Sequence, residues 1–135
     1  MADRLAQCAC GALTATAQGD PDAVVMCHCD ACQRRSGSPF GVAGYWPSSK
    51  IKIEGAYNSY RRGADSGRGL TNHFCPTCGV TLFFVPENKV DTWGIPVGAF
   101  ADPNFPPPVR SVWEQGQHSW CTYNIELQHF PRGRS

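Results

Sequence analysis

Seven of the eight cysteines stand in three short groups along the chain, and thiolates are the protein ligands that soft metal ions prefer. The groups are Cys8 with Cys10, Cys27 with Cys29 and Cys32, and Cys75 with Cys78. An even number of cysteines in an exported chain would suggest disulfides, but residues 1–7 lack the apolar core of a signal peptide. We therefore expect a cytoplasmic protein whose reduced thiols bind metal, rather than a disulfide-bonded one.

The number of ligands in each group divides the cysteines between two kinds of zinc site. Structural zinc takes four protein ligands, whereas catalytic zinc takes three and keeps one position open for substrate. The two outer pairs complete one four-thiolate set, which predicts a structural zinc. The central group of three supplies one ligand too few, which predicts a catalytic zinc and a total of two zinc ions per chain.

Other ligand sets stay open from the spacing alone. A fourth ligand for the central group could come from His28, His73 or Cys121, which would make that site structural as well. The alternation of an extended segment points His28 away from its cysteine neighbours, and a lone Cys121 fits a small buried side chain. His73, His118 and His129 fit surface or hydrogen-bonded histidines, and an iron–sulfur cluster suits the split spacing less well than zinc.

The composition predicts one mainly β domain over residues 1–135. The 135 residues include 14 glycines and 11 prolines, which favour turns over long helices, so we expect only a few short helical turns. The formal net charge of +1 does not fit a nucleic-acid-binding protein, which usually carries a strongly basic face. The sequence has no apolar run long enough to span a bilayer, so no membrane partner is expected.

Alternating and apolar runs predict short strands separated by turns. The predicted strands cover residues 8–18, 24–27, 40–46, 50–54, 56–61, 70–74, 81–85, 90–97 and 109–113. Leu13, Ala15 and Ala17 share one face of the first of these strands. Residues 1–7 are predicted to be a polar lead-in, residues 63–69 a Gly/Ser loop that carries Arg68, and residues 131–135 a frayed tail.

A short helix is predicted directly after the central cysteines. Asp30 is expected to cap its N-terminus, with Gln33 as the second member of a capping box, and Gly37 is expected to end it. A helix N-terminus offers unpaired N–H groups and partial positive charge, which favour thiolate over thiol. The helix would therefore support a site at the central group.

The stretches 8–11, 27–37 and 74–79 resemble the glutathione-dependent formaldehyde-activating enzyme family, which also includes centromere protein V. The resemblance extends through the Asp102–Pro103 turn and Trp113 to residues 118–120. It implies a β-tent fold of stacked antiparallel sheets that is stapled by zinc. It also implies a structural zinc on Cys8, Cys10, Cys75 and Cys78 and a catalytic zinc on Cys27, Cys29 and Cys32.

The activity that the resemblance implies is condensation of glutathione with formaldehyde to S-hydroxymethylglutathione, formally a carbon–sulfur lyase reaction in reverse and a detoxification step. Zinc held by three thiolates suits a substrate thiol better than a carbonyl, because coordination converts the thiol to the nucleophilic thiolate. Arg34, Arg35, Arg61, Arg62 and Arg68 are available to compensate the negative charge. Two alternatives are a non-catalytic zinc-stabilised binding module and the same chemistry on another thiol or aldehyde.

Overall fold

The computed structural model describes residues 2–63 and 68–134, and the described chain is built mainly from short strands. The strands are β1 (Asp3–Gln7), β2 (Thr14–Gln18), β3 (Ala23–Cys27), β4 (Gly41–Pro47), β5 (Ile51–Glu54), β6 (Asn58–Arg62), β7 (Leu70–Phe74), β8 (Thr81–Pro86), β9 (Thr92–Pro96), β10 (Arg110–Val112) and β11 (Gln128–His129). The helices are α1 (Asp30–Ser36) and the 3₁₀ turns η1 (Ser48–Lys50), η2 (Val97–Phe100) and η3 (Glu114–Gly116). Most of the predicted Gly/Ser loop, residues 64–67, lies outside the described residues.

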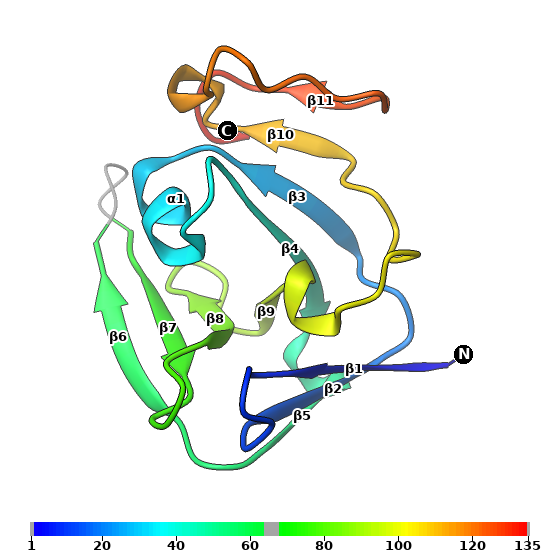
Figure 1. The fold of residues 1–135 in the computed structure, drawn as a ribbon, viewed down its shortest axis with the longest axis vertical. Coiled ribbons are helices and arrows are strands. Elements are labelled where there is room, and N and C mark those ends of the chain that lie inside the picture. The colour runs from blue at the N-terminus through cyan, green and yellow to red at the C-terminus, as the bar shows by residue number, and fades with distance from the viewer. Residues whose placement is uncertain (1, 64–67, 135) are drawn as a thin grey trace.

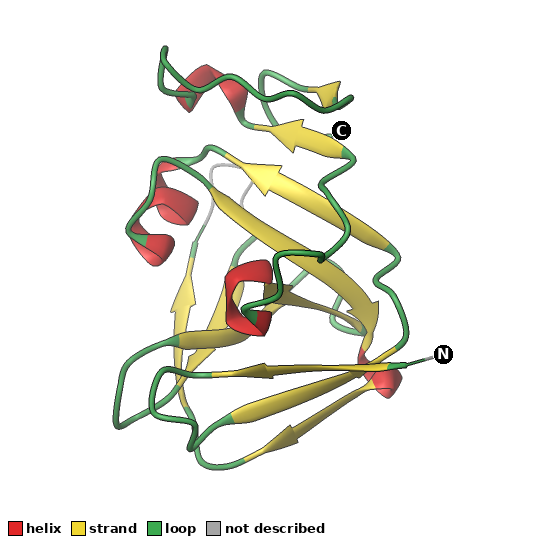
Figure 2. Cartoon of the chain, turned by 45° about the vertical axis from the view of Figure 1, so that its right-hand side comes forward, coloured by secondary structure: helices red, strands yellow, loops and turns green. Residues whose placement is uncertain are grey.

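The strands form two sheets, which confirms the prediction of a mainly β fold. One sheet has the order β1-β2-β5, and the other has the order β11-β10-β3-β4-β9-β8-β7-β6. The three-stranded sheet lies across the lower part of the molecule, and the larger sheet curves above it (Figures 1 and 2). Helix α1 lies beside the end of β3 and the start of β4, in the upper half of Figure 1 and away from the small sheet.

The hydrophobic core lies between the small sheet and one face of the large one. It contains Leu13, Ala15 and Ala17 from the small-sheet side, the three residues predicted to share a face. Trp46 on β4 and Phe83 on β8 are the largest of the fully buried side chains on the facing sheet. The indole of Trp46 donates a hydrogen bond to the carbonyl oxygen of Gly19 at 3.1 Å, so its one polar atom is satisfied.

The edge of the large sheet is parallel, which differs from the expected stack of antiparallel sheets. Strand β10 pairs in parallel with both β3 and β11, whereas the other strand pairs are antiparallel. The pairing places Val112 next to Cys27 and Ser111 next to Met26. The C-terminal part of the chain thereby lies beside the strand that leads into the central cysteines.

Three predictions are wrong, two about the ends of the chain and one about where a strand begins. Residues 3–7 are not a polar lead-in but strand β1, because their backbone pairs along β2 even though only Ala6 is fully buried. The next strand begins at Thr14 rather than at Cys8, since residues 8–13 form a turn in which the N–H of Cys8 donates to Leu13 at 3.0 Å. The tail is held in place as far as residue 132, because the carbonyl oxygen of Arg132 accepts a hydrogen bond from the N–H of Trp113 at 2.9 Å.

Within residues 2–63 and 68–134, no helix is both long enough and apolar enough to cross a membrane.

Candidate functional site

The two outer cysteine pairs come together in one cluster, as the sequence predicted. Cys8 and Cys10 lie in the turn between β1 and β2, and Cys75 and Cys78 lie in the turn between β7 and β8. The four sulfur atoms all lie within 4.8 Å of one another. Cys8 and Cys75 are buried in the hydrophobic core, whereas Cys10 is exposed and Cys78 half-buried, so this cluster joins the two sheets at the margin of the core.

The distances within this cluster fit a tetrahedral zinc ion. Four ligands about 2.3 Å from a zinc ion stand about 3.8 Å from one another. The Sγ atoms of Cys8 and Cys10 are 3.7 Å apart, and those of Cys10 and Cys75 are 3.6 Å apart. Backbone N–H groups point at the sulfurs, including that of Leu13 at 3.3 Å from Cys8, which is typical of thiolate ligands.

Cys27, Cys29 and Cys32 form a second cluster, the thiol triplet, whose members are all half-buried. Cys27 ends β3, Cys29 precedes α1, and Cys32 lies in the first turn of α1. The Sγ atoms of Cys27 and Cys29 are 3.4 Å apart, somewhat closer than the about 3.8 Å between thiolates that share a zinc ion. Among the described residues, no histidine or carboxylate completes this group.

Cys29, not Asp30, is the N-cap of α1. Its sulfur accepts a hydrogen bond from the N–H of Cys32 at 3.3 Å, and its backbone is extended, as an N-cap requires. Asp30 is the first helical residue instead, and Gln33 does not close a capping box. The Gln33 amide donates to the carbonyl oxygen of His28 at 2.8 Å, while Gly37 ends the helix in the left-handed conformation as predicted.

Hydrogen bonds among the thiols of the triplet lower the pKa of one cysteine and raise the pKa of another. The Cys27 thiol donates to Cys29 and lowers the pKa of Cys29, and Cys32 acts in the same direction. The same bond to Cys29 raises the pKa of Cys27. One thiolate is thus favoured while its neighbour retains a proton, because adjacent thiolates repel one another without a cation between them. A bound divalent ion would replace those protons.

In the four-thiol cluster, too, hydrogen bonds lower the pKa of one cysteine and raise the pKa of another. A hydrogen bond from the N–H of Val80 lowers the pKa of Cys78 to about 6. The N–H of Ala12 acts to lower the pKa of Cys10, but the neighbouring thiols Cys75 and Cys8 raise it to about 11. The donor set is therefore chemically suited to a cation that carries charge +2.

Arg35 brings positive charge to the triplet. Its guanidinium lies 5.3 Å from the centre of the Phe84 ring, a cation–π contact. Its Nη2 atom lies 2.7 Å from where a Cβ atom of Gly41 would stand, and the Cβ of Cys32 lies 3.5 Å from the same point. Any side chain at position 41 would displace Arg35 from Cys32. Arg62 adds a second favourable charge, which helps to lower the pKa of Cys29.

Tyr45 lies on the face of β4 that carries Gly41, the partner of Cys27, and no local pattern in the sequence marks it as a site residue. Burial raises the pKa of Tyr45, and the charges of Cys32 and Cys27 raise it further. The alternation of β4 puts Tyr45 on the same face as Gly41, but only the pairing of β4 with β3 brings that face to Cys27. A strand pairing between distant segments cannot be read from one strand alone.

His28 points away from the thiols, as its place between two cysteines predicted. Its fully buried ring is hydrogen-bonded through Nε2 to the Ser111 hydroxyl at 2.9 Å. Ser111 also lowers the pKa of Glu114, whose carboxylate lies 2.6 Å from Nδ1 of His129. We call this series of side chains, from His28 through Ser111 and Glu114 to His129, the His28 relay. It connects the loop of the triplet to β10 and η3.

The other candidate ligands have partners elsewhere. His73 is hydrogen-bonded to Ser59 at 2.7 Å, and His118 to Gln33 at 3.1 Å. Cys121 is buried and belongs to neither cysteine cluster, which is the small hydrophobic role predicted for it.

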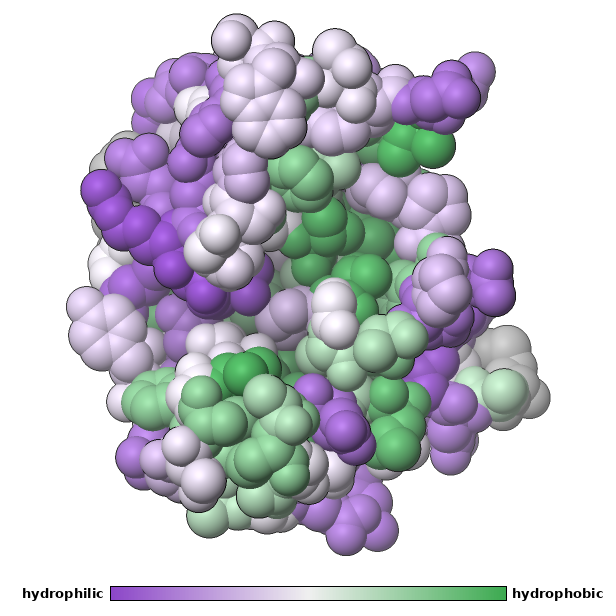
Figure 3. Space-filling view, viewed as in Figure 1, coloured by the Kyte–Doolittle hydropathy of each residue, from purple (hydrophilic) through white to green (hydrophobic). Residues whose placement is uncertain are grey.

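Two hollows lie outside the triplet. A groove of about 870 Å³ runs from the C-terminal half of α1 to the turn that holds Cys78, and its walls include Arg35, Phe40 and Val42. Hydrophobic surface lines the hollow in the middle of this face (Figure 3). None of the triplet cysteines is among the described residues of its wall.

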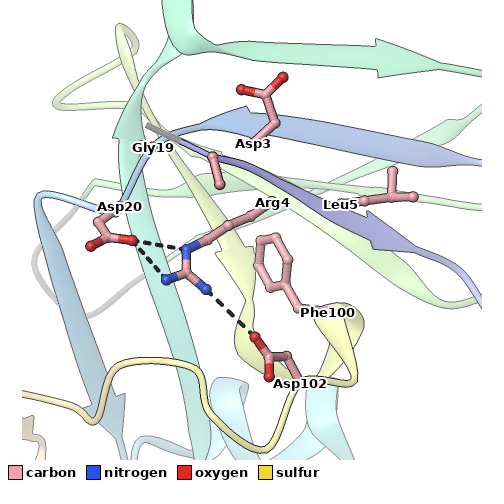
Figure 4. A pocket seen from close by; sticks show the side chains of 8 residues that line it. Asp3, Arg4, Leu5, Gly19, Asp20, Phe100 and Asp102 are labelled. Carbon is pink, nitrogen blue, oxygen red and sulfur yellow. Dashed lines mark hydrogen bonds and ion pairs between the residues drawn. The ribbon is translucent and has the colours of Figure 1, made fainter.

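A second hollow of about 470 Å³ lies beside β1 and is lined by an ion-pair group. Arg4 reaches Asp20 at 2.7 Å and Asp102 at 3.6 Å, so it braces β1 against two turns (Figure 4). The guanidinium also covers the Phe105 ring at 4.7 Å, which fits a structural role.

Comparison with known proteins agrees with this arrangement. The family model of the glutathione-dependent formaldehyde-activating enzyme matches residues 3–116, which include all seven clustered cysteines. None of the curated proteins matches the chain. A crystal structure of a Rhodobacter sphaeroides protein superposes with a TM-score of 0.58 at 21% sequence identity, over 76% of this chain and 91% of that one, and supports the fold alone. The chain belongs to the glutathione-dependent formaldehyde-activating enzyme family.

Proposed function

We propose that this protein is a zinc-dependent enzyme of the carbon–sulfur lyase type, which condenses glutathione or a related thiol with formaldehyde to S-hydroxymethylglutathione and so removes the aldehyde. The observation that carries the proposal is the half-buried triplet of thiols beside α1, which supplies three ligands, one fewer than a structural zinc takes. Membership of the family supports glutathione and formaldehyde as the reactants.

The two cysteine clusters have different roles in this proposal. Cys8, Cys10, Cys75 and Cys78 hold a structural zinc, because a complete four-thiolate set leaves no position for substrate. Cys27, Cys29 and Cys32 hold a catalytic zinc. These thiols must stay reduced to bind the metal, which fits a reducing compartment such as the cytoplasm.

A zinc ion at the triplet would keep the substrate thiol ionised near neutral pH, where a free thiol with a pKa of about 8.5 is mostly protonated. The chain supplies the positioning. Cys29 is held by the N–H of Cys32, which fixes the ligand loop against α1. Arg35 and Arg62 offset the negative charge that three thiolates bring, so that an anionic thiol can approach. Holding the two reactants together supplies the remaining advantage over reaction in solution.

The decisive experiment measures zinc per chain and then the formation of S-hydroxymethylglutathione by wild type, Cys32→Ser and Cys121→Ser. Cys121→Ser is the matched control, because it removes a buried thiol outside both clusters. We expect two zinc ions and a rate above the uncatalysed reaction for wild type and the control. Cys32→Ser should keep one zinc and lose the rate.

A wild-type rate equal to the uncatalysed background would contradict the enzyme and favour a binding module. Loss of folding by Cys32→Ser, with the control still folded, would make the triplet a second structural site.

A further inference from the structure

One face of β4 turns toward the thiol triplet and carries Gly41, Ala43 and Tyr45. Successive side chains of a strand point to opposite faces, so these alternate residues share one face. Cys27 lies directly opposite Gly41 in the antiparallel pair of β3 and β4, and residues in such pairs point to the same face. Positions 41 and 43 carry only a hydrogen and a methyl group, and the space over Gly41 on this face holds the Arg35 guanidinium from α1, with its Nη2 2.7 Å from where a Cβ would stand.

The ring of Tyr45 is held in place by an aromatic contact. Phe84, Gly94 and Tyr45 lie in one row across β8, β9 and β4. The Phe84 ring lies over Gly94, with an atom 2.4 Å from where a Cβ would stand, and meets the Tyr45 ring edge-on at 5.9 Å. The same Phe84 ring carries the Arg35 guanidinium. Tyr45 and Arg35 are thereby fixed by one common support.

The phenol of Tyr45 lies among charges of both signs. Apart from burial, the groups that act on its pKa are Cys32 and Cys27, which raise it, and Arg35 and Arg110, which lower it. A tyrosine phenol has an ordinary pKa of about 10, so it keeps its proton at neutral pH and is available as a donor.

The other three tyrosines do not share this position. Tyr57 and Tyr60 are 43% and 64% exposed. The hydroxyl of Tyr123 is buried beside Cys121, outside both clusters.

We propose that Tyr45 is a catalytic residue that donates its phenolic O–H to the oxygen of the aldehyde, an assignment that rests on the proposed function. As the thiolate forms the carbon–sulfur bond, the π bond of the carbonyl breaks and its electron pair moves to oxygen. The phenol proton passes to that oxygen to give the hydroxymethyl group, and Tyr45 regains a proton from water. Donors directed at a developing oxyanion are worth about 10²–10³ in kcat.

The test compares Tyr45→Phe with Tyr57→Phe, since each removes one hydroxyl and keeps the ring. Tyr57 is the matched control because its ring packs edge-on against Phe83, which belongs to the core on the other side of the sheet. We expect Tyr45→Phe to bind the wild-type amount of zinc, to keep KM within about twofold and to lose about 10²-fold in kcat. Tyr57→Phe should match wild type in all three.

A binding measurement separates this assignment from the proposed function. Calorimetry compares S-(2-hydroxyethyl)glutathione with S-propylglutathione, which has a methyl group in place of the hydroxyl. Wild type and Tyr57→Phe should prefer the hydroxyl compound by about tenfold, and Tyr45→Phe should lose the preference.

Each outcome falls on one side. The wild-type protein could react at the background rate and still bind the hydroxyl compound more tightly than Tyr45→Phe does. That result would overturn the proposed function but would support a contact between Tyr45 and a ligand hydroxyl. Wild-type kcat in Tyr45→Phe, or equal binding of the two compounds by the wild-type protein, would overturn the role of Tyr45.

Discussion

The hydroxyl of Ser111 connects the loop of the thiol triplet to the C-terminal part of the chain. It is fully buried and stands between Nε2 of His28 and the carboxylate of Glu114. The Nδ1 atom of His28 has no hydrogen-bond partner, so Ser111 supplies the ring's side-chain bond. A buried imidazole that loses such a bond retains the full cost of its desolvation.

We therefore expect Ser111→Ala to lower the free energy of unfolding by about 1–3 kcal/mol, measured by urea titration of the zinc-loaded protein. Ser59→Ala is the matched control, because Ser59 makes a similar 2.7 Å bond to His73 at an exposed site. The control should change the free energy by less than about 0.5 kcal/mol. Equal effects of the two substitutions would show that the buried relay adds nothing to stability.

Glu114 gives the relay a dependence on pH. Burial raises the pKa of this carboxyl, but hydrogen bonds from His129 and Ser111 more than offset that effect, so the pKa lies below its ordinary value. The unfolded chain therefore binds the proton at higher pH than the folded one does. The contribution of ionised Glu114 to the free energy of unfolding is fully present above the ordinary pKa of the carboxyl. It is lost as the pH falls through the lower pKa that Glu114 has in the folded protein.

Urea midpoints measured from about pH 6 downward should accordingly fall more steeply for wild type than for Glu114→Gln, and the difference between the two should vanish in acid. Glu126→Gln removes the same charge from an exposed position and controls for net charge. A difference that stays constant with pH would contradict a role for the ionised Glu114.

At the scale of elements, α1 depends on how it ends. Gly37 adopts φ 68° and its N–H donates to the carbonyl of Gln33 at 2.8 Å, which closes the last turn. A Cβ at this position would meet no atom within 4 Å, so backbone strain alone decides the effect of a substitution. The left-handed conformation costs a residue with a Cβ about 1–2 kcal/mol.

Gly37→Ala should lower the free energy of unfolding by about 1 kcal/mol, and Gly37→Asn by less, because asparagine tolerates this conformation. Gly98→Ala is the control, since a Cβ there also meets nothing within 4 Å and the backbone is not left-handed. Chemical denaturation of the three variants measures the effect. A loss in Gly98→Ala equal to that in Gly37→Ala would refute the strain argument.

The end of α1 was predictable from sequence, whereas its start and the edge strands were not. A glycine after a short polar helix is a local signal, so Gly37 was identified correctly. Asp30 outranks cysteine as a cap by propensity, but here the ligand geometry places the sulfur of Cys29 on the N–H of Cys32. Strands β1 and β11 bury little surface and depend on backbone pairing with distant segments, which leaves little pattern in their residues.

At the scale of the molecule, the cysteine groupings were predictable because ligand number and spacing carry their own rule, and both sets meet in the fold. Tyr45 and Ser111 were not predictable, since each reaches the site through a partner strand remote in sequence. The four-thiol cluster has the larger structural consequence. It joins the β1–β2 turn to the β7–β8 turn, and it contributes two side chains to the core itself.

This difference predicts that the zinc ion of the triplet is released before the zinc ion of the four-thiol cluster. Structural zinc binding contributes about 10–16 kcal/mol, as much as the whole stability of a typical domain, so emptying the four-thiol cluster should unfold the protein. The triplet has only three protein ligands, and none of them belongs to the hydrophobic core, so it should release its ion first, with the fold intact. Titration with a chelator, followed by zinc release and circular dichroism together, should show one ion lost before any spectral change and the second lost with unfolding. Cys29→Ser should remove the first phase alone, and Cys10→Ser should prevent stable folding. Release of both ions in a single step that coincides with unfolding would contradict the separate roles of the two clusters.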